Sequence, residues 1–284
     1  MSRHGTDLER ALTPRLADLA GLKAVVLCGG RGARLAPLTS VLPKPLMPIG
    51  DRSILEVVVR RLARSGITDV TLCVGYLSHL IRAVFDNGPS RGLDITWVNE
   101  KEPLGTAGPL KRVPGLESTF LVMNGDVLTT LDLRDFVAQH KQADNLLTIA
   151  THRRTLKIDY GVLRHEPDEH RDRLISFEEK PEIPLTVSMG IYVMEPELLE
   201  LIPDEGPFDF PDLVRAALGA DLPVGVYLYD GNWFDIGRHE DYEQAVTAWS
   251  QDDSSLRAEL DPGLEPHDAD DTKRAARDAS ASSV

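Results

Sequence analysis

The sequence predicts an α/β protein with a Rossmann-like, mixed and mainly parallel sheet flanked by helices, together with a smaller second part. Three observations support this fold class. Short apolar segments alternate with helical patterns along the chain. A glycine-rich turn follows the first apolar segment directly. The 284 residues, 42% of them hydrophobic, suffice for one large core.

The expected strands are short and rich in branched apolar side chains. They cover residues 24–27, 70–74, 95–98, 120–123, 146–151 and 191–194. Residues 53–65 place five apolar side chains on one helical face, which predicts a helix between the first two strands. Residues 174–177, the strand that begins at Gly190 and residues 224–229 are expected to form the second, mixed part.

Both ends of the chain differ from this central region, which we place at residues 22–249. Residues 1–21 form an N-terminal extension in which leucines recur at helical spacing, although Pro14 interrupts a continuous helix. This extension would dock on the body or on a second subunit, or fray. Residues 250–284 contain nine acidic and four basic residues and no aromatic residue, which predicts a disordered acidic tail.

The composition excludes several classes of protein. A net charge of −14 argues against a general nucleic-acid binder, whose surface would be basic. Charged residues interrupt the first 20 residues, and no apolar run of 18 residues occurs, so we expect a cytoplasmic protein without a membrane partner. Cys28 and Cys73 lie in separate apolar strands and are expected to be buried free thiols.

The glycine-rich turn has the residues of a phosphate-binding loop. Its glycines free the backbone so that several N–H groups can point into one concavity. Arginine adds a planar fork for phosphate oxygens, and a lysine between Pro43 and Pro45 adds a compact charge. The residues expected to hold a nucleotide here are Leu27, Gly29, Gly30, Arg31, Gly32, Arg34 and Lys44.

Two common phosphate-binding motifs are not matched by this turn. A P-loop ends in Gly-Lys-Ser/Thr, and no such tripeptide occurs in the chain. A dinucleotide fingerprint needs a third glycine where Leu35 stands. The sequence therefore supports neither a P-loop ATPase nor a dehydrogenase.

The turn resembles the opening motif of the sugar-1-phosphate nucleotidyltransferases. Further motifs of that family follow in the same order, at residues 103–108, 124–126, 159–161, 178–181, 190–192 and 233–237. Together they span roughly residues 22 to 245, and six short motifs in order are highly specific. The resemblance implies one mixed-sheet domain with a nucleotide-binding half and a smaller sugar-binding subdomain.

The resemblance also implies roles for individual residues. Asp126 and Asp235 would bind Mg²⁺, which prefers a few carboxylates completed by phosphate and water. The sugar phosphate would contact Tyr160, Gly161, Glu179, Lys180 and Ser188, the last in a segment that departs from the usual family pattern.

Residues 102–108 would recognise the nucleobase, through Glu102, Gly105 and Thr106. This segment is most similar to mannose-1-phosphate guanylyltransferases, which favours GTP over dTTP, UTP, CTP or ATP. Ala33 stands where many relatives have threonine, so one hydroxyl contact to the nucleotide would be missing.

The activity implied by the resemblance is transfer of a nucleotidyl group from an NTP to a sugar or sugar-like 1-phosphate. Arg34, Lys44, Asp126 and Lys180 are the expected catalytic residues. A homo-oligomer is compatible with the sequence. Within the family, a thymidylyl-, uridylyl-, cytidylyl- or adenylyltransferase stays open. Three other interpretations also remain: a noncatalytic nucleotide-sugar sensor, a structural interaction protein, and a glycosyltransferase, which usually has an Asp-X-Asp motif that residues 126–128 lack.

Overall fold

The computed structural model describes residues 17–30, 32–86, 92–167, 172–250 and 255–260, and these form a mixed α/β fold. A seven-stranded sheet lies at its centre, in the order β12-β8-β11-β6-β1-β4-β5. Four of its six strand pairs are parallel; β11 is antiparallel to both of its neighbours. The strands are β1 Lys23–Cys28, β4 Asp69–Val74, β5 Asp94–Asn99, β6 Phe120–Asn124, β8 Leu147–Lys157, β11 Glu182–Met194 and β12 Val224–Tyr229. The predicted fold class is confirmed.

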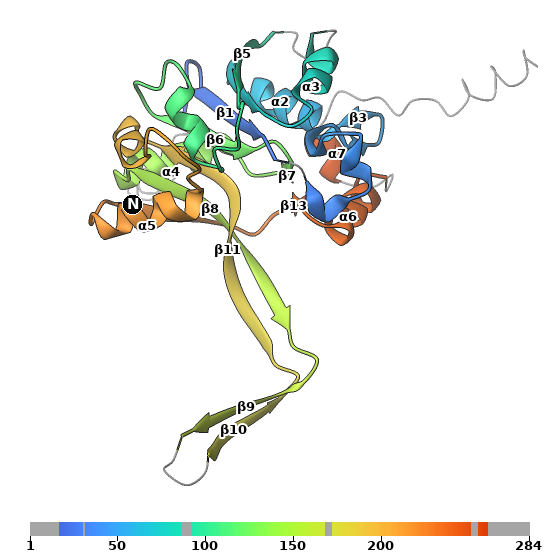
Figure 1. The fold of residues 1–284 in the computed structure, drawn as a ribbon, viewed down its shortest axis with the longest axis vertical. Coiled ribbons are helices and arrows are strands. Elements are labelled where there is room, and N and C mark those ends of the chain that lie inside the picture. Colours follow the sequence, from blue (N-terminus) through green and yellow to red (C-terminus); the bar gives the residue numbers. More distant parts are fainter. Residues whose placement is uncertain (1–16, 31, 87–91, 168–171, 251–254, 261–284) are drawn as a thin grey trace, which may run out of the picture.

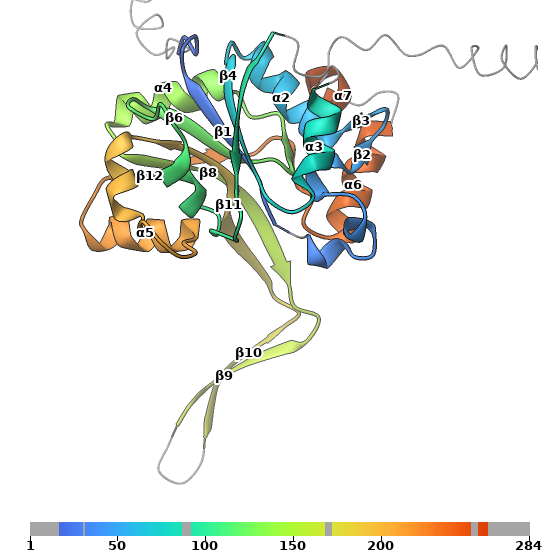
Figure 2. The same cartoon turned by 45° about the horizontal axis from the view of Figure 1, so that its top comes forward.

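Helices cover both faces of this sheet (Figure 2). They are α2 Ile54–Arg64, α3 Ser78–Phe85, α4 Leu133–Ala143, α5 Phe210–Gly219, α6 His239–Ser250 and α7 Ser255–Leu260. One hydrophobic cluster joins the sheet to α2, α3, α4 and α6, and a second joins its other face to α5. Alternate residues of β1 point into the two clusters, Val26 into the first and Val25 into the second.

The sequence predicted these elements through ordinary local signals. The helix expected at residues 53–65 is α2, which begins after Ser53, whose hydroxyl accepts a hydrogen bond from the Glu56 N–H at 3.2 Å. Cys28 and Cys73 are buried free thiols, as expected. Burial raises the pKa of both, that of Cys73 to about 12, so neither is poised as a nucleophile.

Two short sheets complete the body. β2 Pro48–Ile49 pairs with β3 Arg52–Ser53, and β7 Val127–Thr129 pairs antiparallel with β13 Trp233–Asp235. The β7–β13 pair joins the first half of the chain to the last described strand. The Ile236 N–H also donates to the Asp126 carbonyl oxygen at 3.1 Å, which fixes Asp126 beside Asp235.

A long two-stranded arm projects from the body (Figure 1). Its stalk is the outer part of β8 and β11, and its tip is the hairpin of β9 Gly161–Glu166 and β10 Arg173–Glu179. The expected composition of the second part is therefore wrong: β12 and the inner half of β11 belong to the central sheet. Residues 174–177 lie in the tip, where they pair only with β9.

The structure describes residues 17–21 of the N-terminal extension and residues 250 and 255–260 of the expected tail. Leu19 is buried, and the Ala17 N–H donates to the Arg134 carbonyl, so the end of the extension packs on the body. At the other end, α7 follows residue 250, and its Leu260 is only 1% exposed. Residues 1–16, 251–254 and 261–284 lie outside the described part. None of the helices in the described part is long and apolar enough to cross a membrane.

Candidate functional site

The glycine-rich turn follows the carboxyl end of β1 and has a backbone conformation that depends on glycine. Gly30 and Gly32 have φ values of +95° and +59°, which side chains with a Cβ rarely adopt. Thr39 stabilises the turn by donating its hydroxyl to the Gly32 carbonyl at 2.8 Å. Gly29 and Gly30 line a pocket at this end of the strand, together with Leu27. Arg31 lies outside the described residues.

Lys44 lies at the centre of a charged cluster. A short 3-10 helix, Lys44–Leu46, presents it after Pro43, in the fixed manner that the flanking prolines suggest. Its Nζ forms an ion pair with Asp126 Oδ2 and lies 3.9 Å from Asp235 Oδ1. Arg34 is exposed on the neighbouring 3-10 helix, and its charge opposes a small part of the increase that burial causes in the pKa of Asp235. The structure thus brings together four residues from three distant parts of the sequence.

The two aspartates of this cluster suit a magnesium ion. Asp126 Oδ1 is buried without a hydrogen-bond partner, so it has a coordination position to offer. Desolvation raises the pKa of Asp235, and the nearby Asp126 raises it further, as expected for two carboxylates that share one site. The described residues contain no cluster of three or more metal-binding side chains. A magnesium ion here would therefore take its other ligands from phosphate and water.

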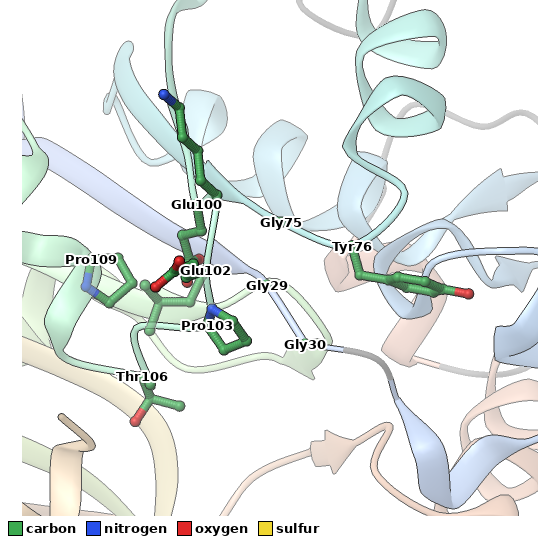
Figure 3. A pocket seen from close by; sticks show the side chains of 12 residues that line it. Gly29, Gly30, Gly75, Tyr76, Glu100, Glu102, Pro103, Thr106 and Pro109 are labelled. Atoms are coloured by element: carbon green, nitrogen blue, oxygen red, sulfur yellow. The ribbon is translucent and has the colours of Figure 1, made fainter. Parts of the chain in front are cut away.

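A pocket of about 410 Å³ adjoins the glycine-rich turn. Figure 3 shows it between Gly29 and Gly30 on one side and the loop with Pro103 and Thr106 on the other, with Tyr76 at its far end. The pocket is large enough for a nucleobase with its ribose, and it opens beside the phosphate-binding turn. This arrangement is suited to a nucleotide.

Glu100 is one of several pocket residues that the sequence analysis missed, together with Gly75, Tyr76, Lys101 and Pro109. Glu100 follows β5 directly and is partly buried, and its Oε2 accepts a hydrogen bond from the Leu104 N–H at 3.3 Å. A Cβ added to Gly29 would lie 2.7 Å from its Oε1, so this carboxylate lies against the turn. Burial raises the pKa of Glu100. Its position at the carboxyl end of a parallel strand was the available signal.

The pocket lining includes the three residues that were expected to recognise the nucleobase, and their environments differ. Glu102 is exposed. Gly105 has a φ of +78°, and a Cβ there would meet the Phe208 carbonyl oxygen at 2.6 Å, so the loop approaches α5 closely. The Thr106 hydroxyl donates to Asp209 at 3.0 Å and accepts from the Phe210 N–H at 2.9 Å. Its hydroxyl therefore anchors the loop to the start of α5.

The residues expected to bind the sugar phosphate are not assembled with the Lys44 cluster. Gly161 and Glu179 pair with each other in the tip of the arm. Tyr160 and Lys180 form the corner between stalk and tip, where the Lys180 N–H donates to the Tyr160 carbonyl at 3.3 Å. Ser188 stands at the root of the arm and donates to the Tyr192 hydroxyl at 3.2 Å. The cause is the outer part of the β8–β11 ladder, paired from Thr151–Ser188 to Lys157–Glu182, which carries the arm away from the body (Figure 1).

Trp233 connects the root of the arm to the charged cluster. Its indole N–H donates to the Met189 carbonyl at 3.2 Å, beside the irregular pairing of β8 and β11. The Arg154 guanidinium lies 4.9 Å from the centre of the Trp233 ring. Asp235 lies on the same three-residue strand, β13. This strand therefore both contacts the root of the arm and carries one candidate magnesium ligand.

Comparison with known proteins identifies the family of this chain. The Nucleotidyl transferase family matches residues 23–252. The chain is 36% identical over 225 residues to a mannose-1-phosphate guanylyltransferase of Mycobacterium tuberculosis, covering 77% of this chain and 62% of the relative. It is 31% identical over 245 residues to a UTP–glucose-1-phosphate uridylyltransferase of Synechocystis, covering 79% and 62%. The chain thus spans about 62% of the length of these relatives.

Solved structures show the same fold. HddC from Yersinia pseudotuberculosis complexed with GMP-PN has a TM-score of 0.61 and 25% identity, covering 80% of this chain and 98% of that one. A putative glucose-1-phosphate thymidylyltransferase from Bacillus anthracis has a TM-score of 0.62, with 22% identity, covering 81% and 96%. The chain therefore belongs to the nucleotidyl transferase family, among the sugar-1-phosphate nucleotidyltransferases.

Proposed function

We propose that this protein transfers a nucleotidyl group from an NTP, with GTP favoured, to a sugar or sugar-like 1-phosphate. The products are an NDP-sugar and pyrophosphate. The observation that carries the proposal is the Lys44–Asp126–Asp235 cluster, which lies with Arg34 beside a glycine-rich turn and a nucleotide-sized pocket. The expected cytoplasmic location is part of the same proposal.

The chemistry is an in-line displacement at the α-phosphorus of the NTP. An oxygen of the sugar 1-phosphate forms the new P–O bond, the α–β bridging P–O bond breaks, and pyrophosphate leaves with that electron pair. The nucleophile is already anionic, so no general base is needed. Lys44, Arg34 and the N–H groups of the turn would neutralise and orient the triphosphate. Bound Mg²⁺, held by Asp126 and Asp235, would add charge neutralisation.

Glu100 supports the preference for GTP. Guanine presents two adjacent donors, N1–H and the 2-amino group, and a carboxylate can accept from both. The adenine Watson–Crick edge has an acceptor at N1, and each pyrimidine edge has at least one carbonyl acceptor, which would face the negative charge. We therefore assign to Glu100 the role that the sequence analysis gave to Glu102. The guanylyltransferase relative supports GTP, whereas the uridylyltransferase relative supports the alternative, UTP.

The sugar-phosphate side of the proposal depends on the arm. Lys180 would neutralise the attacking phosphate, and Glu179, Tyr160, Gly161 and Ser188 would contact the sugar. These assignments rest on the family resemblance, because four of the five residues lie on the arm. Binding in this manner requires the corner of the arm, at Tyr160 and Lys180, to lie close to the Lys44 cluster.

A matrix of NTPs against sugar 1-phosphates, with pyrophosphate release as the readout, tests the function. We expect GTP to exceed dTTP, UTP and CTP in kcat/KM by at least about tenfold, which is roughly 1.4 kcal/mol and within the range of one or two hydrogen bonds. Release of a nucleoside diphosphate instead would indicate a glycosyltransferase. Binding of nucleotide sugars without turnover would indicate the noncatalytic alternative.

A further inference from the structure

The segment that leads into α5 holds the loop of residues 102–108, which lines one side of the pocket. The Phe208 N–H donates to the Leu104 carbonyl at 2.8 Å. The Phe208 carbonyl accepts from the N–H groups of Ala107 and Gly108, each at 2.9 Å. This side of the pocket therefore takes its shape from a much later part of the chain.

The Asp209 carboxylate adds two hydrogen bonds to a single residue of the loop. Its Oδ1 accepts from the Thr106 N–H at 2.8 Å and from the Thr106 hydroxyl at 3.0 Å. The Phe210 N–H donates to the same hydroxyl at 2.9 Å. Because a hydroxyl has one proton and an amide N–H can only donate, the Thr106 proton must go to Asp209. The position of Thr106 thus requires an acceptor at residue 209.

The anchoring segment is itself fixed to the central sheet. Phe210 is only 3% exposed, and its ring stacks on the Tyr192 ring of β11 with 3.9 Å between the centres and 4° between the planes. The loop lies close against this anchor, since a Cβ added to Gly105 would be 2.9 Å from Asp209 Oδ1. Close packing against a fixed neighbour leaves the loop little freedom to move.

The loop in turn holds Glu100, the carboxylate to which we assign recognition of guanine. The Leu104 N–H donates to Glu100 Oε2 at 3.3 Å, while the Leu104 carbonyl accepts from Phe208. One loop residue therefore lies between the anchor and the carboxylate. A carboxylate that is held in its bound orientation loses less conformational entropy when a ligand binds, which favours affinity and selectivity.

We infer that Asp209 is a positioning residue for base recognition. Its carboxylate fixes Thr106, and the loop then holds Glu100 where the two guanine donors would meet it. Asp209 does not itself line the pocket, so it acts through the loop. Figure 3 shows the Thr106 oxygen directed away from Glu100, in agreement with an anchoring function for this hydroxyl. The inference rests on the proposed function, because it takes the pocket to hold the nucleobase.

Calorimetric titration of the full chain with GTP and with ITP tests this role without any turnover. We expect Asp209→Ala to weaken GTP binding at least about tenfold, because it removes two hydrogen bonds to a charged group. The preference for GTP over ITP should be lost in the same variant. Asp209→Asn keeps an oxygen that can accept both bonds, so it should retain most of this preference. Binding of pyrophosphate, which has no base, should be unchanged in both variants.

The matched control is Asp212→Ala, in the same first turn of α5. The Asp212 carboxylate accepts from the Asp209 N–H at 3.4 Å and forms an ion pair with Arg215 at 2.5 Å. Its loss disturbs the start of the helix but leaves the Thr106 contacts in place. The control should keep the preference for GTP over ITP.

The outcomes separate this inference from the proposed function. A base preference that Asp209→Ala leaves intact, or that Asp212→Ala lowers equally, overturns the inference alone. A wild type that binds no nucleotide, or binds all of them equally, overturns it together with the assignment of the pocket. If the wild type prefers another nucleotide, the same criteria apply to that preference. If Asp209→Ala loses its far-UV circular dichroism, Asp209→Gly decides the question, because glycine is well tolerated at the start of a helix.

Discussion

Replacing Lys44 with methionine should abolish most turnover and yet strengthen metal binding to the nucleotide-free protein. The Lys44 ammonium forms an ion pair with Asp126 and lies near Asp235, and these aspartates are the two candidate magnesium ligands. A metal ion that binds Asp126 Oδ1 and Asp235 therefore shares Asp126 with the Lys44 ammonium, and the two positive charges compete for this carboxylate. Methionine keeps an unbranched side chain that is one atom shorter, and it removes the competing charge.

The expected size of the effect follows from the burial of the pair. The side chains of Lys44 and Asp126 are 14% and 18% exposed, so their contact is only partly screened. A hydrogen bond to a charged group contributes about 1.5–3 kcal/mol, which we reduce to about 1–2 kcal/mol for the exposed rim of the site. This corresponds to a metal Kd about 5- to 30-fold lower in the variant. Loss of an aligned cation should meanwhile cost about 3–4 kcal/mol of transition-state stabilisation, or about 10²–10³ in kcat/KM.

Titration with Mn²⁺, followed by electron paramagnetic resonance, measures the metal affinity directly. The matched control is Arg34→Met, which also removes one positive charge near Asp235 but breaks no direct ion pair with either aspartate. We expect a smaller change in metal affinity for this control and a comparable loss of turnover. Unchanged or weaker Mn²⁺ binding by Lys44→Met would refute the idea that lysine and metal compete for Asp126.

Three further predictions concern the base, the core and the C-terminal helix. Glu100→Gln should lower the preference for GTP over ITP, which lacks the 2-amino group. In the wild type the same preference should fall at acidic pH, because burial raises the pKa of the Glu100 carboxyl and its protonation removes an acceptor; kcat/KM ratios measured across pH check this. Gly125→Ala should lower the free energy of unfolding by about 1–3 kcal/mol in urea titrations, since its Cβ would lie 2.8 Å from a buried sulfur and 3.1 Å from a backbone oxygen. A chain ending at Gln251 should keep its turnover but melt at a lower temperature than one ending after Leu260, whose side chain is buried; equal melting temperatures would contradict the packing of α7.

The sequence predicted the central strands because their signals are local. Branched apolar runs and a capped amphipathic helix at residues 54–64 depend on neighbouring residues only. The cluster of Lys44, Asp126 and Asp235 depended on the family resemblance, since no local pattern brings three distant charges together. Glu100 was missed because a carboxylate after a strand has no distinctive sequence, and its meaning comes from the pocket around it.

The arm could not be predicted from local pattern. The sequence predicts a strand only from Gly190 onward, and the register with β8 shows that residues 182–188 extend the ladder. Because the extended ladder was not foreseen, the position of Tyr160 and Lys180 on the arm was not predicted. For the same reason, β11 and β12 were assigned to the second part instead of the central sheet. Likewise, the buried Leu260 lies in a segment whose composition favours a solvated tail.

The pairing of β7 with β13 has a consequence for how the protein acquires its site during synthesis. Thr129 donates its hydroxyl to the Asn232 carbonyl at 2.8 Å across 103 residues of chain, so this contact closes a very long loop. A nascent chain that has emerged only as far as α5 contains Lys44 and Asp126 but has no strand to bring Asp235 beside them. The complete pair of candidate metal ligands therefore appears only after almost the whole domain has left the ribosome. Metal affinity of a released fragment or a stalled chain would consequently report whether the last strand has docked.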